Sequence, residues 1–276
     1  MLARERECAS GTVARAYARL RSAGVVAGQQ RSLLRVTADG PARARALLRG
    51  CEPLRLTGSD DPALDLLLSV LGDRVALVPG PRGSVTGLSV LARGEADATA
   101  LHLRHMGSGR HNDEFVRPLS AGGPVTLMHL WRREQVLVLP PGNPDGIRSA
   151  ADLTGRRLAW RGSGTGSRLL LERLLREART TVSSDHGVTV DSHLAVAVAV
   201  VSGAADAGLA VRAAAESVGA SWLSVVEEPF ELAIRTSRVD AAEELLEALK
   251  TRQFRAGAGM MRGYDLTRAG SMRRAA

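Results

Sequence analysis

The sequence contains little cysteine and no long apolar run. Its 276 residues include two cysteines, Cys8 and Cys51, which excludes a disulfide framework and leaves no metal-ligand spacing. No hydrophobic stretch is long enough to span a bilayer, and residues 1–7 lack the apolar core of a signal peptide. We therefore expect a cytoplasmic protein that has no membrane partner.

Signatures of the common enzyme classes are also absent from the sequence. There is no Gly-x-Ser-x-Gly elbow, and the glycine-rich residues 162–166 lack both the Walker lysine and the spacing of a dinucleotide fingerprint. His102 and His105 have no cysteine or nearby carboxylate to complete a zinc site. Asp97 and Asp206 are expected to orient turns. We therefore predict no catalytic residues, no metal and no cofactor.

Positive charge is concentrated at the N-terminal end. Residues 1–50 hold ten arginines and three acidic residues, so they carry +7 of the total charge of +8. The whole chain is 45% hydrophobic, which is enough to bury a core in more than one domain. A basic segment on a nearly neutral body favours a polyanionic partner, and a solvated arginine-rich arm is the alternative.

Residues 10–24 have the pattern of a short helix. Ser10 or Thr12 can cap its start, and Gly24 ends it. Residues 25–36 are typical of a hairpin with a polar turn. The apolar stripe of the helix, at spacings of three and four residues, consists of Val13, Ala16, Tyr17 and Leu20.

This helix and hairpin resemble part of a known DNA-binding module. The motif Ser-Gly-Thr-Val-x-Arg-Ala-Tyr-x-x-Leu-x-x-x-Gly-Val-Val resembles the recognition helix and wing of GntR-type winged helix-turn-helix regulators. The resemblance covers about residues 9–36 and does not include the first helix of the module, so the module is either truncated or vestigial. It implies contacts with DNA bases and phosphates. The residues implied are Ser10, Gly11, Thr12, Arg15 and Arg19.

A glycine-rich turn at residues 161–168 lies between a strand-like run and a helical one. Such a turn leaves backbone N–H groups unpaired at the positive end of the helix dipole. The hydroxyl groups of Ser163, Thr165 and Ser167 add further donors. The turn can therefore hold an anion.

The same order of features occurs twice in the body of the chain. Residues 91–102 are similar to residues 201–210, and each segment has a helix end, a Gly-x-Ala-Asp turn and a short strand. A helix beginning near Ser84 precedes the first copy, and one beginning near Ser192 precedes the second. Residues 54–62 match the 161–168 turn. This order predicts a duplicated α/β lobe with helix N-termini along one edge of a largely parallel sheet, whereas a chance likeness of common turns is the alternative.

Two segments can connect such lobes. Residues 124–140 are long enough to cross from the first lobe to the second, and residues 230–234 form a second candidate crossing strand. Residues 147–153 and 241–249 have helical patterns, and the second of these would close the first lobe.

The body of the chain resembles the type II periplasmic-binding-protein fold, in the form found behind DNA-binding modules of bacterial regulators. The motifs that carry this resemblance are Leu-Thr-Gly-Ser-x-Asp-Pro-Ala-Leu-Asp-Leu-Leu (56–67), Arg-Gly-Glu-Ala-Asp (93–97), Arg-Arg-Glu-Gln (132–135), Pro-Gly-Asn-Pro-x-Gly-Ile (141–147), the 161–168 turn, His-Leu-Ala-Val-Ala-x-Ala-Val (193–200) and Ala-Asp-Ala-Gly-Leu (205–209). The resemblance implies a two-lobed α/β domain that closes on a small ligand, with kinship to molybdate-type oxyanion binders.

We therefore expect two domains. Residues 1–50 would be the partial winged helix and linker, and residues 51–276 the binding-protein-like domain. Within it, the first lobe would comprise about residues 51–136 and 232–276, and the second about residues 137–231.

Neutral donors at helix N-termini bind a tetrahedral oxyanion well, because the helix dipoles compensate its charge. Taken singly, each candidate donor has ordinary helix capping as its alternative. The candidate ligand-binding residues are Thr57, Gly58, Ser59, Ser84, His102, Ser163, Gly164, Thr165, Ser192 and His193.

These features predict a ligand-sensing transcriptional regulator. Closure of the lobes on a small anion such as molybdate, tungstate or a pterin compound would change how a homodimer presents its N-terminal helices to DNA. One alternative is a stand-alone cytoplasmic ligand-binding protein without a DNA role. Another is an enzyme that acts on a cofactor precursor in the same cleft.

Overall fold

The computed structural model describes residues 10–28, 33–38, 40–49, 52–182 and 187–275. The chain divides into two compact units, one of residues 1–54 and 72–76 and the other of residues 55–71 and 77–276. None of the helices in the described part has the length and apolar character of a membrane-spanning segment.

The smaller unit contains the predicted helix and hairpin. Helix α2 (Ser10–Ser22) ends before Gly24, whose φ of 67° is favourable for glycine. Strands β1 (Val26–Ala27) and β2 (Arg35–Val36) pair in antiparallel register, which confirms the hairpin, although residues 29–32 of its turn lie outside the described residues. The remaining elements are α3 (Gly40–Arg49), η1 (Gly72–Arg74) and most of β4 (Val75–Leu77), none of which the sequence pattern predicted.

The larger unit has two lobes that repeat one arrangement of strands and helices. In the first, β3 and β5 are parallel; in the second, β7 is parallel to both β8 and β9. The first lobe contains β3 (Leu54–Gly58), α4 (Pro62–Leu71), α5 (Ser84–Ala92), β5 (Ala98–Leu101), α6 (Asp113–Val116) and η2 (Arg117–Gly122). The second contains η3 (Ala150–Leu153), β7 (Leu158–Arg161), α7 (Gly166–Glu177), β8 (Gly187–Val190), α8 (His193–Val201), β9 (Ala207–Val211) and α9 (Arg212–Ser217).

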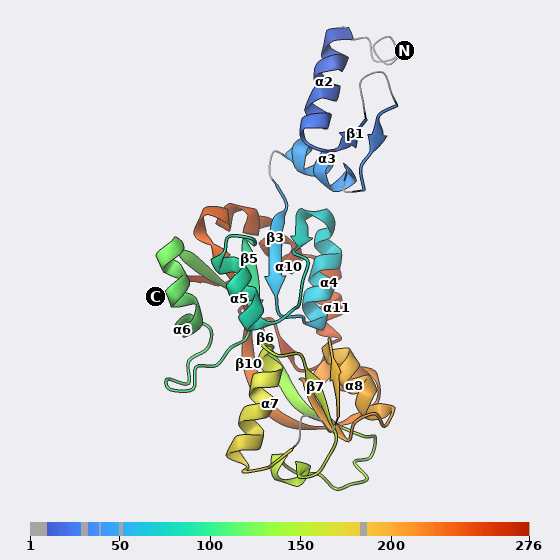
Figure 1. Cartoon of the computed structure of the whole chain (residues 1–276), viewed down its shortest axis with the longest axis vertical. Helices are drawn as coiled ribbons and strands as arrows, with labels where there is room; N and C mark the ends of the chain where they lie inside the picture. The colour runs from blue at the N-terminus through green and yellow to red at the C-terminus, as the bar shows by residue number, and fades with distance from the viewer. Residues whose placement is uncertain (1–9, 29–32, 39, 50–51, 183–186, 276) are drawn as a thin grey trace. The chain divides into compact units, whose positions relative to one another are not determined.

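Two long antiparallel strands run through both lobes, namely β6 (Val125–Leu139) and β10 (Ser221–Arg235). The strand order from β3 is β3-β5-β10-β6-β9-β7-β8, so the crossing strands lie in the middle of the sheet (Figure 1). The second crossing strand is much longer than the predicted segment 230–234. Its first half escaped prediction because it is only partly buried and lacks a continuous apolar run.

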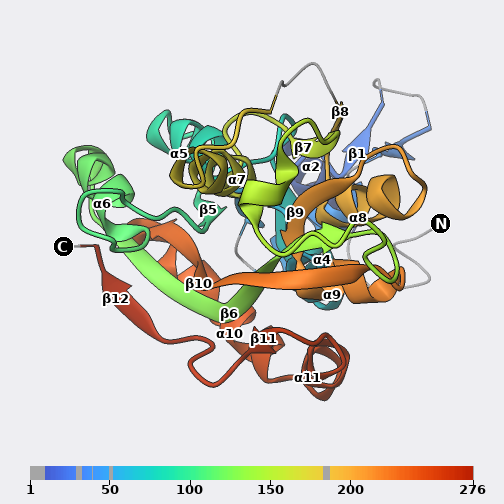
Figure 2. The ribbon, with the colours of Figure 1, turned by 90° about the horizontal axis from the view of Figure 1, so that it is seen from below.

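The C-terminal segment returns to the crossing strands. Strands β11 (Tyr264–Asp265) and β12 (Met272–Arg274) pair with β6, as Figure 2 shows from below. Before them come η4 (Thr236–Ala242), α10 (Glu243–Lys250) and α11 (Arg252–Gly259). The predicted closing helix at residues 241–249 corresponds to α10.

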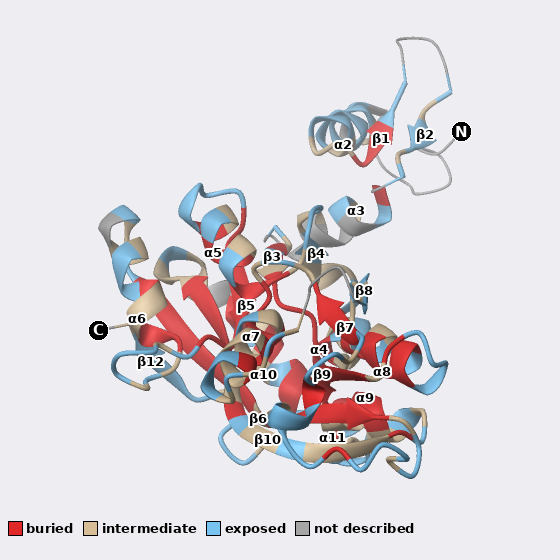
Figure 3. Cartoon of the chain, turned by 60° about the horizontal axis from the view of Figure 1, so that its bottom comes forward, coloured by how far each residue is buried: buried red, intermediate tan, exposed pale blue. Residues whose placement is uncertain are grey.

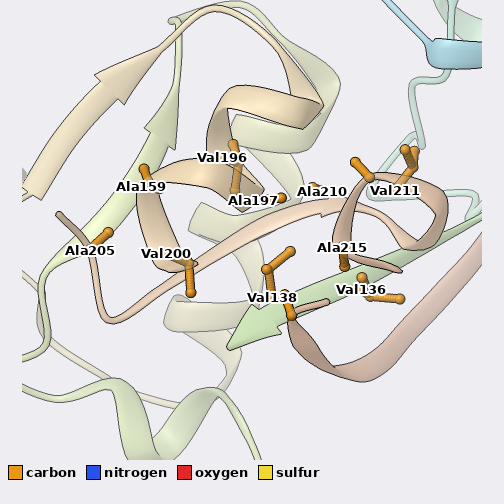
Figure 4. Close-up of a cluster of buried hydrophobic side chains, with 13 residues drawn as sticks. Val136, Val138, Ala159, Val196, Ala197, Val200, Ala205, Ala210, Val211 and Ala215 are labelled. Atoms are coloured by element: carbon orange, nitrogen blue, oxygen red, sulfur yellow. The ribbon is translucent and has the colours of Figure 1, made fainter. Parts of the chain in front are cut away.

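The core follows the sheet. In Figure 3 the strands are largely buried, whereas the helices expose their outer faces. In the second lobe, valines of β6 pack against small side chains of α8, β9 and α9 (Figure 4). The many alanines of α8 and α9 let these helices lie close to the sheet.

Candidate functional site

Polar side chains from both lobes and both crossing strands lie together where the two lobes meet. Strands β5 and β9 run towards each other alongside the crossing strands, so the loops after the parallel strands of each lobe meet near the middle of β6 and β10. The buried members are Ser59, Asp60 and Asp61 after β3, Ser84 in α5, His102 after β5, Arg133 and Gln135 in β6, Arg161 at the end of β7, Ser167 in α7, His193 in α8 and Glu228 in β10. We call this set the interlobe site.

The turn after β3 depends on two glycines. Gly58 has a φ of 102°, and a Cβ there would overlap the backbone of Ala100 in β5. A Cβ on Gly87 would likewise overlap a β5 side chain and the backbone of Gly58. Helix α5 therefore packs directly on the strand ends, which brings the hydroxyl oxygens of Ser84 and Ser59 to 2.6 Å.

Arg133 lies at the centre of a buried ion-pair network. Its Nη1 donates to Asp61 Oδ2 at 2.6 Å, and its Nε and Nη2 donate to Glu228 Oε1 at 3.1 and 3.0 Å. The Tyr264 hydroxyl donates to the same Asp61 oxygen at 3.0 Å. The guanidinium lies 4.5 Å from the ring centroid of Phe230. Arg133 thereby connects the first lobe to both crossing strands.

Arg161 connects the two lobes. Its Nη2 donates to Asp60 Oδ1 at 2.5 Å and to the Asp191 carbonyl at 2.9 Å. Nearby, the Val85 N–H in α5 donates to the Gly164 carbonyl at 3.1 Å. The lobes are therefore in direct polar contact, with an ion pair that is almost excluded from water.

Burial raises the pKa of each carboxylate in the site, and it prevails for Asp61, whose pKa is raised. For Asp60, the charge of Arg161 and its hydrogen bond outweigh burial and hold the pKa well below its usual range. The charge of Arg133 and the hydrogen bonds of His102 and Gln135 do the same for the pKa of Glu228. Asp60 and Glu228 are therefore ionised at neutral pH.

The two histidines of the site are neutral at pH 7. Burial and the charge of Arg133 lower the pKa of His102, and burial lowers the pKa of His193 still further. His102 Nδ1 lies 2.7 Å from Glu228 Oε1. His193 Nδ1 accepts a hydrogen bond from the Val211 N–H at 3.3 Å. The contact with Glu228 places the proton of His102 on Nδ1.

Some buried polar atoms of the interlobe site have no hydrogen-bond partner among the described residues. They include Arg161 Nε and Gln135 Oε1. A buried polar atom without a partner is costly, so such atoms mark positions where a ligand or water can bind.

Two pockets open onto the ends of the interlobe site. The first, of about 360 Å³, reaches His102 and Glu228 and lies between the loop after β5 and helix α7. The second, of about 320 Å³, reaches Asp60 and His193 between α4 and α8. Both volumes are within the range of small-molecule sites.

Comparison with known proteins identifies the fold. The family model of the PBP superfamily domain matches residues 70–250. The chain belongs to the PBP superfamily. The predicted α/β, two-lobed type II domain is thereby confirmed.

Three known proteins are similar to this chain. The uncharacterized protein YvgK of Bacillus subtilis (strain 168) is 25% identical over 226 residues, which cover 80% of this chain and 73% of YvgK. The tungstate ABC transporter structure from Geobacter sulfurreducens has a TM-score of 0.51 and 17% identity, and covers 74% of this chain and 96% of that one. The regulatory domain of MetR, a LysR family regulator from N. meningitidis, has a TM-score of 0.53 and 13% identity, covering 77% and 98%. These solved structures share the fold.

The PBP-superfamily domain brings several of the predicted ligand-binding residues together. Ser59, Ser84, His102 and His193 are buried in the interlobe site, and Gly164 contacts α5 across the lobes. Their role as ligand contacts stays a prediction.

Other predicted residues lie at the margins of the site. Thr165 and Ser192 accept hydrogen bonds from the N–H groups of Arg168 and Ala195, so each caps its own helix. Ser163 is exposed. Thr57 and Gly58 belong to β3.

Sequence reasoning omitted the charged members of the interlobe site as binding residues. Asp60, Arg133 and Glu228 dominate its electrostatics, whereas the turn motifs visible in the sequence are rich in hydroxyl groups and glycines. A signal was present in β6, where a charged and polar run interrupts an otherwise largely apolar strand, and Arg133 and Gln135 are the buried members of that run. A charged residue at such a position needs a partner, and therefore indicates a site.

Proposed function

We propose that this chain is a ligand-sensing transcriptional regulator whose two lobes close on a small anionic ligand. The observation that carries the proposal is Arg161, which is 3% exposed, has an unpartnered Nε among the described residues and bridges the lobes through Asp60. An anion that replaces the Asp60 carboxylate on this guanidinium would satisfy both lobes at once. Its binding energy would then favour the closed arrangement.

The N-terminal unit supplies the proposed output. Helix α2 exposes Arg15 and Arg19, and it carries no acidic residue in its first turn. Exposed arginines on one helix are suited to the phosphates of DNA. Ser10, Gly11 and Thr12 would lie at the base edges in the manner of GntR-type recognition helices. A homodimer would present two such helices, and lobe closure would change their affinity for DNA.

Thermal-shift titration tests the ligand part of the proposal. We expect at least one of molybdate, tungstate, sulfate and phosphate, or an organic anion, to raise the melting temperature. At a hundredfold excess over Kd, the bound ligand should add about 2.7 kcal/mol to the free energy of unfolding. Arg161→Gln should abolish this stabilisation. Arg157→Gln is the matched control, because Arg157 pairs with Asp206 at the exposed end of the same strand. Equal stabilisation of the Arg161→Gln variant would contradict the role of Arg161.

DNA titration at several salt concentrations tests the regulatory part. We expect binding to a mixed-sequence duplex to weaken steeply with salt, and the double variant Arg15→Ala, Arg19→Ala to reduce the slope of log K against log salt by about two. Arg93→Ala is the control, because Arg93 is an exposed arginine of the PBP-superfamily domain. Absence of DNA binding, or binding that does not respond to salt, would refute the regulator.

A further inference from the structure

The pocket at His102 and Glu228 has three chemically different parts, and we refer to it as the side pocket. Its inner end is polar, formed by His102 and Glu228, each 4% exposed. Its walls are apolar and include Leu169 and Phe115. Its rim is basic. These parts lie in one continuous pocket of about 360 Å³.

The inner end offers hydrogen-bond acceptors. Glu228 Oε1 accepts all the described hydrogen bonds to this carboxylate, which come from Arg133 and Gln135. The same oxygen makes the close contact with His102. Glu228 Oε2 has no partner among the described residues, although the group lines the pocket. His102 Nδ1 faces Glu228, so the neutral ring has its lone pair on Nε2. Two neighbouring acceptors at this end are therefore available to the donors of a ligand.

Backbone packing holds the His102 ring at this end. A Cβ added to Gly166, the first residue of α7, would overlap the ring of His102. The ring lies directly against the α7 backbone as a result, and its position depends on the approach of the second lobe. The second lobe thus closes one side of the acceptor pair.

The rim offers cations. Arg104, Arg173 and Arg176 line the side pocket. Among the described residues, neither Arg104 nor Arg176 has a salt bridge, and Arg173 Nε lies 3.6 Å from Glu177 without a hydrogen bond. An anionic group at the rim would meet three guanidinium groups and one carboxylate, Glu172, which Arg168 already holds.

We infer that the side pocket binds an organic anion with a flat apolar body, N–H donors at one end and a phosphate or carboxylate group at the other. The donor end would pair with Glu228 Oε2 and His102 Nε2, the body would lie against Leu169, and the anionic end would reach Arg176. Asp60 and Arg161 do not line the side pocket, so this inference goes beyond the proposed function and rests on it only in assigning the domain an anionic ligand. A bare tetrahedral oxyanion fits poorly, because it has no donors for an ionised carboxylate and leaves the apolar walls empty.

Guanosine 5′-monophosphate is a suitable probe, because its base presents a ring N–H and an amino group on one edge and its phosphate lies at the opposite end. Calorimetric titration of the full chain is compared with inosine 5′-monophosphate, which lacks the amino group, and with guanosine, which lacks the phosphate. We expect each of the two to bind at least tenfold more weakly than guanosine 5′-monophosphate.

Matched variants place the probe in the molecule. Leu169→Trp in α7 fills the side pocket, and Leu194→Trp in α8 fills the second pocket; the two leucines are 43% and 49% exposed, so both helices should fold. We expect Leu169→Trp to weaken binding at least tenfold and Leu194→Trp to leave it unchanged. Arg176→Ala should remove most of the preference for guanosine 5′-monophosphate over guanosine.

The outcomes separate the inference from the proposed function. Stabilisation by molybdate or tungstate without binding of guanosine 5′-monophosphate at millimolar concentration would overturn the inference alone. Loss of binding in Leu194→Trp instead of Leu169→Trp would also overturn it. If neither the oxyanions nor the organic probes bind, the proposed function itself fails.

Discussion

The hydrogen-bond donors around a buried carboxylate on β10 determine its pKa. Glu231 faces away from the interlobe site and is 3% exposed. It accepts hydrogen bonds from Arg273 at 2.6 and 2.8 Å and from Asn112 at 2.9 Å. Burial raises the pKa of Glu231, but these donors together with His129 outweigh it and lower the pKa to about 2. Glu231 thereby adds a side-chain connection between the first lobe and the C-terminal strand β12, which also pairs with β6.

This pairing predicts an acid-sensitive part of the stability. Because the pKa of Glu231 is lower in the folded state than its ordinary value of 4.5, the ionised form stabilises the fold above about pH 4.5, and this contribution is lost as the pH falls towards 2. Its size is on the order of 3 kcal/mol. In urea titrations from pH 6 to pH 3, Glu231→Gln should therefore show a flatter dependence of unfolding free energy on pH. Glu227→Gln, an exposed position of the same strand, should retain the slope of the parent chain.

Helix starts are the elements on which the sequence interpretation depended most. The 161–168 turn was expected to offer hydroxyl groups to an anion, and the helix was expected to begin near residue 169. In the structure α7 begins at Gly166, because Thr165 adopts an extended conformation and accepts from the Arg168 N–H at 3.3 Å. The same hydroxyl donates to the Gly162 carbonyl at 2.8 Å. Thr165 therefore contributes to the stability of the turn in addition to any ligand contact.

A pair of substitutions in this turn distinguishes capping from ligand contact. Thr165→Ala should destabilise the protein by about 1 kcal/mol through loss of the N-cap. Ser163→Ala, two residues earlier and exposed, should change stability by less than about 0.5 kcal/mol. Chemical denaturation without ligand measures both. An effect of Ser163→Ala as large as that of Thr165→Ala would show that the turn has contacts beyond the cap.

At the scale of the whole PBP-superfamily domain, polar contacts between the lobes determine how closed it is. The Asp60–Arg161 ion pair joins the loop after β3 to the end of β7. Breaking a buried pair leaves a charge without its partner, which favours separation of the lobes so that water can reach it.

We therefore expect Asp60→Asn to shift the ligand-free protein towards an open arrangement. Small-angle X-ray scattering should show a larger radius of gyration for this variant. Asp206→Asn is the control, because the Arg157–Asp206 pair lies within the second lobe and is half exposed. An unchanged radius for Asp60→Asn would mean that other contacts, such as Val85 with Gly164, suffice for closure.

Much of the fold could be predicted from the sequence because the information is local. The Gly-x-Ala-Asp turns, the apolar helices before them and the 54–62 pattern appear in the structure as two copies of one arrangement. The site was less predictable. Hydroxyl groups at helix starts are visible in the sequence, but Thr165 and Ser192 cap their own helices.

The sequence by itself determined the α/β class, the duplicated lobe, the N-terminal helix and hairpin, and the uneven charge, because periodicity, turn residues and composition are properties of neighbouring positions. Only the tertiary structure decided that Arg133 lies between Asp61 and Glu228 and that Arg161 reaches Asp60. These partners are separated by 72 to 101 positions in the chain. Pairing over such separations depends on strand order and on the approach of two lobes, neither of which a local pattern contains. The pairing of β5 with β10 likewise places His102 and Glu228 at the inner end of one pocket.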